Sequence, residues 1–194
     1  SRAGTEPPKP LGVLRATGAR GLVEDEQAVR AGLEALGDPA RHVLILKADL
    51  VSAVHRRARM DVIALPIRDG KGRLTGISCY AGLFTSHALA TPPEDVPLLA
   101  ERVERLAKKL DFAPASHAAK ALIHAVTQLP RDLLFAADDD VLHGLAVTAM
   151  SLIDRPRPKA MTVPDPLGRH TNVLVWLPRD AFSMRRREEI ALLA

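Results

Sequence analysis

The sequence contains very little cysteine and few aromatic residues, and each shortage excludes a class of protein. Cys79 is the single cysteine among 194 residues, so the chain cannot form a disulfide framework, and this usage suits a reducing cytoplasm. With one Trp, one Tyr and four Phe, the chain has too few rings for a nucleic-acid surface that works by base stacking. The core must therefore be built mainly from Ala, Val, Leu and Ile.

Long apolar runs and a strong excess of one charge are also missing. No apolar segment approaches the roughly 18 residues that are needed to span a bilayer. The formal charge is +4, from 27 basic and 23 acidic residues that are interspersed along the chain. The 47% hydrophobic and 26% charged residues are typical of a globular protein. We therefore expect a cytoplasmic globular protein with no membrane segment and no nucleic-acid partner.

Common catalytic and cofactor motifs are absent from the sequence. There is no dinucleotide fingerprint, P-loop, G-x-S-x-G elbow or paired Cys/His spacing for a metal. The stretch "ADDDV" at 137–141 could suggest a metal site, but consecutive carboxylates on a helix point in different directions. Acidic residues there fit a helix start, where they offset unpaired N–H groups. We predict no catalytic, cofactor-binding or metal site.

The first part of the chain predicts one helix laid against an antiparallel sheet. The helix is indicated over 23–37, with Val29, Leu33 and Leu36 on its apolar face. Runs rich in branched residues predict strands over 42–55, 60–69 and 74–85. A further short strand is expected at "LGVLR", residues 11–15. Together these elements predict a compact α+β unit.

A proline-rich stretch at 91–97 separates this unit from a second, mainly helical pattern. Helices are expected over 98–110, over 116–130 with Ser116 as N-cap, and over 138–154. Two strands around the turn "DPLG" and a helix from 183 complete the pattern. The predicted fold class is α+β, with antiparallel sheets and helices packed on one face.

The most cationic stretch of the sheet region is "LVSAVHRRARMD", residues 50–61. In a strand, alternate residues share a face, so His55 and Arg57 would lie together and could bind a small anion. Structural pairing with Asp61 is the favoured alternative, because ion pairs are the commoner explanation of such clusters. An enzyme built on His55 and Cys79 would need an orienting partner and nucleophile that the sequence does not indicate.

Six segments follow one another in a specific order over residues 43–187. They are "SAVHRRARMD", "GLFTSHAL", "VPLLAERVERL", "SHAAKAL", "LPRDLLF", and "DPLGR" with "VWLPRDAFS". Each resembles the segment at the same place in the order of the large bacterial NAD-specific glutamate dehydrogenases. The segment "MTVPDP" is less basic than the family pattern, and "SHAL" lacks the aromatic residue usual after "TS".

The resemblance implies that the chain comes from the N-terminal region that precedes the dehydrogenase core. ACT-like and PAS-like sensor domains occur there in the family. Residues 11–90 would be a PAS-like unit, 91–114 a connecting helix, and 115–194 an ACT-like unit truncated at its C-terminus. The parent enzyme would oxidatively deaminate L-glutamate to 2-oxoglutarate with NAD, whereas this segment would be non-catalytic and would hold no cofactor.

The implied role is regulation or oligomerisation, with the other domains and subunits of the parent enzyme as partners. A small amino acid is the candidate effector, and the C-terminal hairpin is a candidate subunit contact. The candidate effector or interface residues are His55, Arg57, Asp61, Gly168 and Arg169. The alternative is a purely structural scaffold that assembles subunits without binding a ligand.

Overall fold

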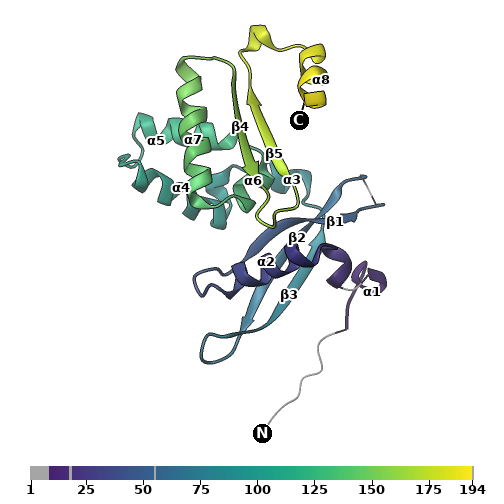
Figure 1. Ribbon diagram of the computed structural model, residues 1–194. Helices are drawn as coiled ribbons and strands as arrows, with labels where there is room; N and C mark the ends of the chain where they lie inside the picture. Colours follow the sequence, from purple (N-terminus) through teal and green to yellow (C-terminus); the bar gives the residue numbers. More distant parts are fainter. Residues whose placement is uncertain (1–8, 18, 55, 194) are drawn as a thin grey trace. The chain divides into compact units, whose positions relative to one another are not determined.

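A computed structural model describes residues 9–17, 19–54 and 56–193. They form two compact units, which meet in the sequence after Thr85. Both units combine helices with a small antiparallel sheet, so the predicted α+β class is confirmed (Figure 1).

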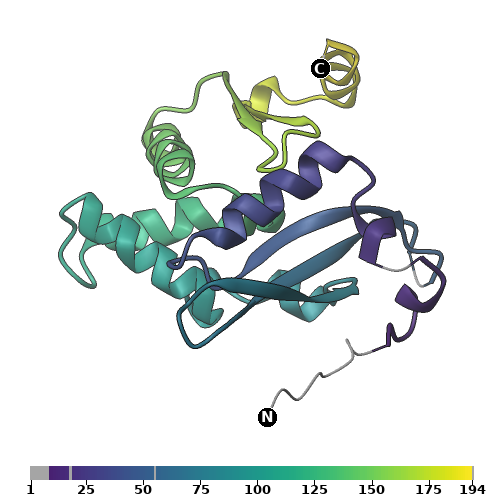
Figure 2. The same cartoon turned by 60° about the horizontal axis from the view of Figure 1, so that its bottom comes forward.

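The first unit is a three-stranded sheet covered by one long helix. Its elements are α1 (Leu14–Thr17), η1 (Ala19–Leu22), α2 (Glu26–Gly37), β1 (Leu44–Val51), β2 (Arg59–Arg68) and β3 (Leu74–Gly82). The strands lie in the order β1-β2-β3 and every pair is antiparallel. In Figure 2, α2, drawn in dark indigo, runs along one face of this sheet. The expected strand at 11–15 is wrong, because Leu14–Thr17 forms a turn of helix.

Small residues decide which face of α2 lies on the sheet. The buried positions of the helix are Ala28, Gly32 and Leu36, spaced four residues apart. Of the predicted apolar face, Leu36 is buried, but Val29 and Leu33 remain 41% and 45% exposed. Ala and Gly let a helix backbone approach the strands closely, so the helix is rotated from the orientation that hydrophobicity alone predicts. The sheet residues buried on the helix-covered face are Leu44, Leu46, Ala48, Val62 and Ala64.

The second unit consists mainly of helices with a hairpin packed on them. Its elements are α3 (Ser86–Ala90), η2 (Pro93–Asp95), α4 (Pro97–Lys109), α5 (His117–Thr127), α6 (Arg131–Ala136), α7 (Asp139–Asp154), β4 (Lys159–Pro164), β5 (Thr171–Trp176), η3 (Arg179–Ala181) and α8 (Met184–Leu193). The predicted N-cap of α5 is confirmed, since the Ser116 hydroxyl accepts the N–H of Ala119 at 3.1 Å. The short helix α6, which begins after Pro130, was not predicted as a separate element.

The core of the second unit joins four helices, α4 to α7, and the hairpin. Leucine and valine side chains fill it at helical spacing, and β4 contributes Val163, which is 1% exposed. From β5, Leu174 and Trp176 pack against the same cluster. The buried members from the helices are Leu99, Val103, Leu106, Leu122, Val126, Leu133, Leu134, Leu142, Leu145 and Ala146. In the part of the chain that the structure describes, no helix is both long and apolar enough to cross a membrane.

Candidate functional site

The cationic stretch at 50–61 is mostly a loop. Strand β1 ends at Val51 and β2 begins at Arg59, so these residues connect a β-hairpin. Ser52 is 2% exposed, and its hydroxyl donates to the carbonyl of Val54 at 2.9 Å and accepts the Val54 N–H at 3.2 Å. The Ser52 N–H donates across the loop to the carbonyl of Ala58 at 2.9 Å. The chain therefore turns here, because the serine hydroxyl bonds the local backbone in place of a strand partner.

Arg57 lies in this loop and not in the strand that the sequence predicts. His55 lies outside the described residues. Arg57 is exposed in the loop. Its neighbour Arg56 donates through Nη2 to the carbonyl of Phe84 at 3.2 Å, which ties the loop to the chain beyond β3. Arg57 thus remains a surface cation of the hairpin.

Asp61 is a buried structural carboxylate. Its side chain is 5% exposed, and its Oδ1 lies 2.5 Å from Nζ of Lys47. The two residues stand directly opposite each other in the β1–β2 register. The other oxygen, Oδ2, accepts the N–H of Phe84 at 2.8 Å. Both carboxylate oxygens therefore already have partners within the first unit.

Gly168 and Arg169 belong to the turn between β4 and β5. Gly168 has φ +71, a left-handed conformation that glycine adopts without strain. Arg169 donates two hydrogen bonds to Asp165, from Nε to Oδ2 at 2.9 Å and from Nη2 to Oδ1 at 3.1 Å. Both side chains are 7% exposed. Burial raises the pKa of Asp165, but the hydrogen bonds and charge of Arg169 outweigh it and hold that pKa below its ordinary value. This pair fixes the hairpin turn.

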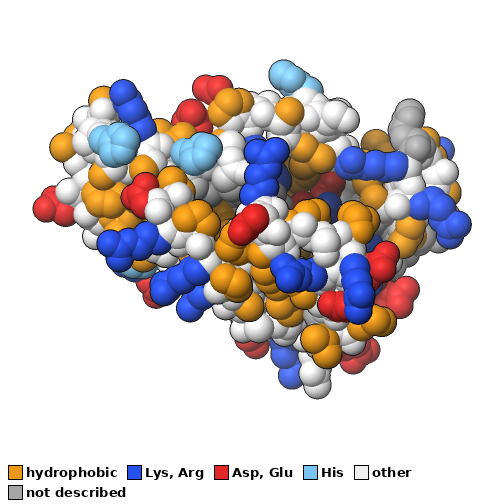
Figure 3. Space-filling view, turned by 90° about the horizontal axis from the view of Figure 1, so that it is seen from above, with side chains coloured by type: hydrophobic (Ala, Val, Ile, Leu, Met, Phe, Trp, Pro, Cys, Tyr) orange, Lys and Arg blue, Asp and Glu red, His pale blue; other side chains and the backbone are white. Residues whose placement is uncertain are grey.

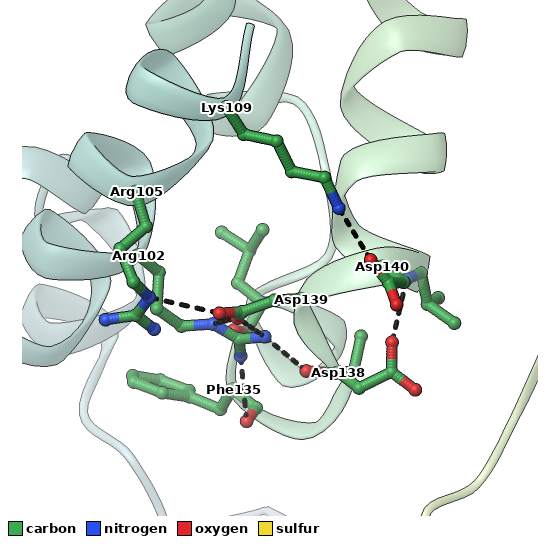
Figure 4. Close-up of polar contacts among 10 residues, drawn as sticks. Arg102, Arg105, Lys109, Phe135, Asp138, Asp139 and Asp140 are labelled. Atoms are coloured by element: carbon green, nitrogen blue, oxygen red, sulfur yellow. Dashed lines mark hydrogen bonds and ion pairs between the residues drawn. The ribbon is translucent and has the colours of Figure 1, made fainter.

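Sequence reasoning missed an ion-pair network that joins α4 to the start of α7 (Figure 4). Arg102 donates through Nη1 to the carbonyl of Leu134 at 2.7 Å, through Nη2 to the carbonyl of Ala137, and through Nη2 to Oδ1 of Asp139 at 2.9 Å. Arg105 donates through Nε to Oδ2 of the same Asp139 at 3.0 Å. A single arginine thus satisfies carbonyls at the end of α6 and a carboxylate on α7.

The carboxylates of "ADDDV" divide between capping and pairing. Asp138 caps α7, because its Oδ1 accepts the N–H of Val141 at 2.8 Å. Asp140 pairs with Nζ of Lys109 at 2.6 Å, and this hydrogen bond lowers the pKa of Asp140. Burial raises the pKa of Asp139, but Arg105 and Arg102 together hold it below its ordinary value. The interpretation of "ADDDV" as the start of a helix is thus confirmed. The signal for the ion pairs was the basic residues of α4, which recur at helical spacing.

The described residues bear on two chemistries that the sequence raises, a metal site and an activated cysteine. Among the residues that have a described placement, no three His, Cys, Asp or Glu side chains gather in a way that could hold a metal ion. Cys79 is partly buried, and burial raises the pKa of its thiol. An activated cysteine nucleophile requires a lowered pKa.

An open apolar groove runs along β5 and faces α8. Its volume is about 670 Å³. It is lined by Val173, Val175, Trp176, Leu177, Arg179, Phe182, Arg187, Ile190 and Ala191. Figure 3 shows, for one face of the molecule, hydrophobic side chains exposed among scattered Lys, Arg, Asp and Glu. This groove is a concave feature of the second unit that could receive an apolar partner.

Comparison with known proteins indicates a family. Residues 96–155, which contain α4 to α7, match the family profile described as glutamate dehydrogenase, helical motif 1. The NAD-specific glutamate dehydrogenase of Pseudomonas aeruginosa is 32% identical over 144 residues, 74% of this chain and 9% of that protein. That of Halomonas elongata is 30% identical over 134 residues, 69% of this chain and 8% of that protein. The chain thus spans less than a tenth of the length of these relatives.

Proposed function

Because the chain belongs to the NAD-specific glutamate dehydrogenase family, we propose that it is a non-catalytic assembly and regulatory segment of such an enzyme. The parent enzyme would oxidise L-glutamate to 2-oxoglutarate with NAD, using a dinucleotide site in another part of the polypeptide. The partners of this segment would be the other domains and the other subunits of that enzyme.

The observation that carries this proposal is that the charged residues of helical motif 1 bind one another or the backbone. Arg102, Arg105 and Lys109 on α4 bind Asp139 and Asp140 on α7 or backbone carbonyls. Catalytic groups need access to a substrate, whereas these groups join helices to one another. A helical unit tied together in this way suits a rigid element that holds or orients other domains.

Within this role we assign a PAS-like unit to residues 11–90 and an ACT-like unit to residues 115–194, joined by the helix in 91–114. The three-stranded antiparallel sheet with α2 on one face supports the first assignment. The hairpin β4–β5 followed by α8 supports the second. The joining helix, α4, contributes to the same core as α5 and α7.

At Asp61 and Arg169, the existing partners favour a structural role over the binding of an amino-acid effector. An amino-acid effector needs a carboxylate for its ammonium group and a cation for its carboxylate. Asp61 already binds Lys47, and Arg169 already binds Asp165. Of the charged candidates that the structure describes, Arg57 remains exposed to solvent. A sensor would therefore have to use Arg57, His55, which lies outside the described residues, or residues not considered from the sequence.

A thermal-shift screen of the chain against amino acids, 2-oxoglutarate, NAD and nucleotides tests the proposal. A ligand at ~100 times its dissociation constant adds about 2.7 kcal/mol of stability, which is easily seen. A scaffold predicts no shift with any of them. A selective shift with one amino acid, lost in Arg57→Ala and retained in the exposed control Arg30→Ala, would establish sensing instead. Glutamate-dependent formation of NADH by the chain alone would refute the non-catalytic role.

A further inference from the structure

Two of the segments that resemble the family meet at the point where the first unit ends. The segment "SAVHRRARMD" supplies Arg56 and Asp61, and "GLFTSHAL" supplies Phe84. Oδ2 of Asp61 accepts the N–H of Phe84 at 2.8 Å, and Nη2 of Arg56 donates to the carbonyl of Phe84 at 3.2 Å. Side chains of the first unit therefore bond both polar groups of one backbone residue, directly before the boundary that follows Thr85. We refer to these two bonds as the exit clamp.

A second set of bonds holds the chain where the second unit begins. Arg131, from the segment "LPRDLLF", donates through Nη2 to the carbonyl of Thr91 at 2.6 Å and to that of Leu89 at 3.3 Å. Thr91 in turn donates to the carbonyl of His87, through its N–H at 2.9 Å and through its hydroxyl at 2.8 Å. We refer to these bonds as the entry clamp, because they fasten residues 87–91 to the start of α6.

The guanidinium of Arg131 is held in the entry clamp at a cost. Its Nε and Nη1 are buried, and neither has a hydrogen-bond partner among the residues that the structure describes. Buried donors without a partner destabilise a fold. This arrangement therefore favours a specific role for Arg131 in holding α3 over a general role in stability.

The two clamps leave a short stretch of chain between them, Thr85 and Ser86. Both residues are exposed. The helix α3, which begins at Ser86, has five residues and none of them is buried. The backbone at this point is therefore not fixed by packing, whereas hydrogen bonds fix it on both sides. Hinges lie at such places, at the ends of elements with few buried contacts.

We propose that Thr85 and Ser86 form the pivot about which the first and second units change orientation. Arg56, Asp61 and Arg131 are then positioning residues that confine the rotation to these two residues. Compact units of one chain change orientation by default, unless a large apolar interface joins them. The inference rests on the proposed regulatory role and names the moving part that this role requires.

The sequence around the pivot distinguishes it from a flexible linker. Flexible linkers are rich in glycine and serine, and semi-rigid spacers are rich in proline. The stretch "LFTSHAL", residues 83–89, contains neither glycine nor proline and one serine. With both clamps closed, changes of φ and ψ at two residues turn each unit as a rigid body. The expected motion is therefore a rotation of limited range about a defined point.

Pulsed electron paramagnetic resonance on the 194-residue chain tests the proposal. In a Cys79→Ala background, spin labels at Lys71→Cys in the β2–β3 turn and at Lys120→Cys on α5 report the distance between the units. Labels at Lys71→Cys and Arg30→Cys on α2 report a distance within the first unit. All three labelled positions are exposed. The distance distribution between the units should be at least about twice as broad as the one within the first unit.

A glycine substitution locates the pivot. Thr85→Gly adds backbone freedom at the pivot and should broaden the distribution between the units further. Ala113→Gly, in the exposed loop between α4 and α5, is the matched control and should leave the distribution unchanged. A distribution between the units that is as narrow as the one within the first unit overturns the inference. Equal effects of the two glycine substitutions overturn it as well.

Arginine substitutions test the two clamps. Arg131→Met opens the entry clamp, and Arg56→Met removes one bond of the exit clamp, so each should broaden the distribution between the units. Arg57→Met, on the same exposed loop as Arg56, is the matched control and should not. Fluorescence of Trp176 verifies that the second unit of Arg131→Met is folded. A substitution of Arg131 or Arg56 that lowers stability without changing the width overturns the clamp to which that arginine belongs.

Failure of this inference is distinguishable from failure of the proposed function. Two units that keep one orientation overturn the pivot and leave the non-catalytic assembly role standing, because a rigid scaffold also assembles subunits. Formation of NADH by the chain alone overturns the non-catalytic role, whatever the width of the distance distribution.

Discussion

Replacement of Arg102 with methionine would test whether one arginine holds helical motif 1 together. Methionine retains much of the apolar stem and removes the guanidinium. The Arg102 side chain is 13% exposed and donates to the carbonyls of Leu134 and Ala137 and to Asp139. The substitution would leave the carbonyls at the end of α6 without this donor, in a partly buried place.

The expected loss follows from the number of acceptors. Each hydrogen bond from a charged donor contributes about 1.5–3 kcal/mol, and water would restore part of the loss. Two such bonds go to the carbonyls of Leu134 and Ala137, and the pair with the half-exposed Asp139 adds less, so we expect Arg102→Met to cost about 3–5 kcal/mol. Arg105→Met is the matched control on the same helix, because Arg105 is 53% exposed and bonds the same Asp139. Exposed pairs contribute about 0–1 kcal/mol.

A third variant separates the carboxylate from the carbonyls. Asp139 is 51% exposed, so Asp139→Asn should cost about 1 kcal/mol, well below the cost of Arg102→Met. If Arg102 stabilised the unit only through Asp139, the two substitutions would cost the same. The difference between them therefore measures what the bonds to the α6 carbonyls contribute.

Urea unfolding followed by the fluorescence of Trp176 is the appropriate assay, because Trp176 is the single tryptophan and belongs to the second unit. With a slope of about 2 kcal/mol per molar urea, a loss of 4 kcal/mol lowers the midpoint by about 2 M. Arg105→Met should lower it by less than about 0.5 M. Equal decreases in the urea midpoint for Arg102→Met and Arg105→Met would refute the conclusion that the buried Arg102 stabilises this motif more than Arg105 does.

Two further predictions concern carboxylates that already have partners. Arg169 holds the pKa of Asp165 below its ordinary value, so this pair stabilises the fold above the unfolded pKa, and its contribution is lost as pH falls through the folded pKa. At pH 7, Asp165→Asn should therefore have a lower free energy of unfolding than the parent sequence, and this difference should shrink below about pH 4. Urea midpoints at each pH measure it, and a difference that does not change with pH contradicts the prediction. Asp61→Asn should destabilise the first unit by about 1–3 kcal/mol through loss of the charge opposite Lys47. Thermal unfolding monitored by far-UV circular dichroism checks it, and an unchanged transition would show that the pair contributes nothing.

Local signals were sufficient to predict most helices and strands. Ser116 caps α5 and Asp138 caps α7, and both caps are readable because the capping group lies within three residues of the N–H that it accepts. The strands β2 and β3 were predicted from branched residues around a turn, and the structure contains both. The strand expected at 11–15 was wrong because five residues carry too little pattern to separate a strand from a turn of helix.

The candidate residues were predicted as chemical types, but their partners were not. Arg169 and Asp165 are four residues apart, yet they meet only because the turn at Gly168 brings them together. Asp61 and Lys47 are fourteen residues apart, and their contact requires the antiparallel register of β1 and β2. Without that register, a carboxylate beside "HRRAR" is compatible with an effector site as well as with the internal ion pair that the sequence favours.

The sequence by itself determined the α+β class, the helix caps, the start of α7 at the acidic run and the relationship to glutamate dehydrogenases. These properties depend on residues close together in the chain, or on the order of motifs along it. The tertiary structure decided which face of α2 is buried and which arginine joins α4 to α6. Those outcomes depend on close packing and on partners as much as 37 residues apart, such as Arg102 and Asp139. Only the folded chain brings such groups within bonding distance.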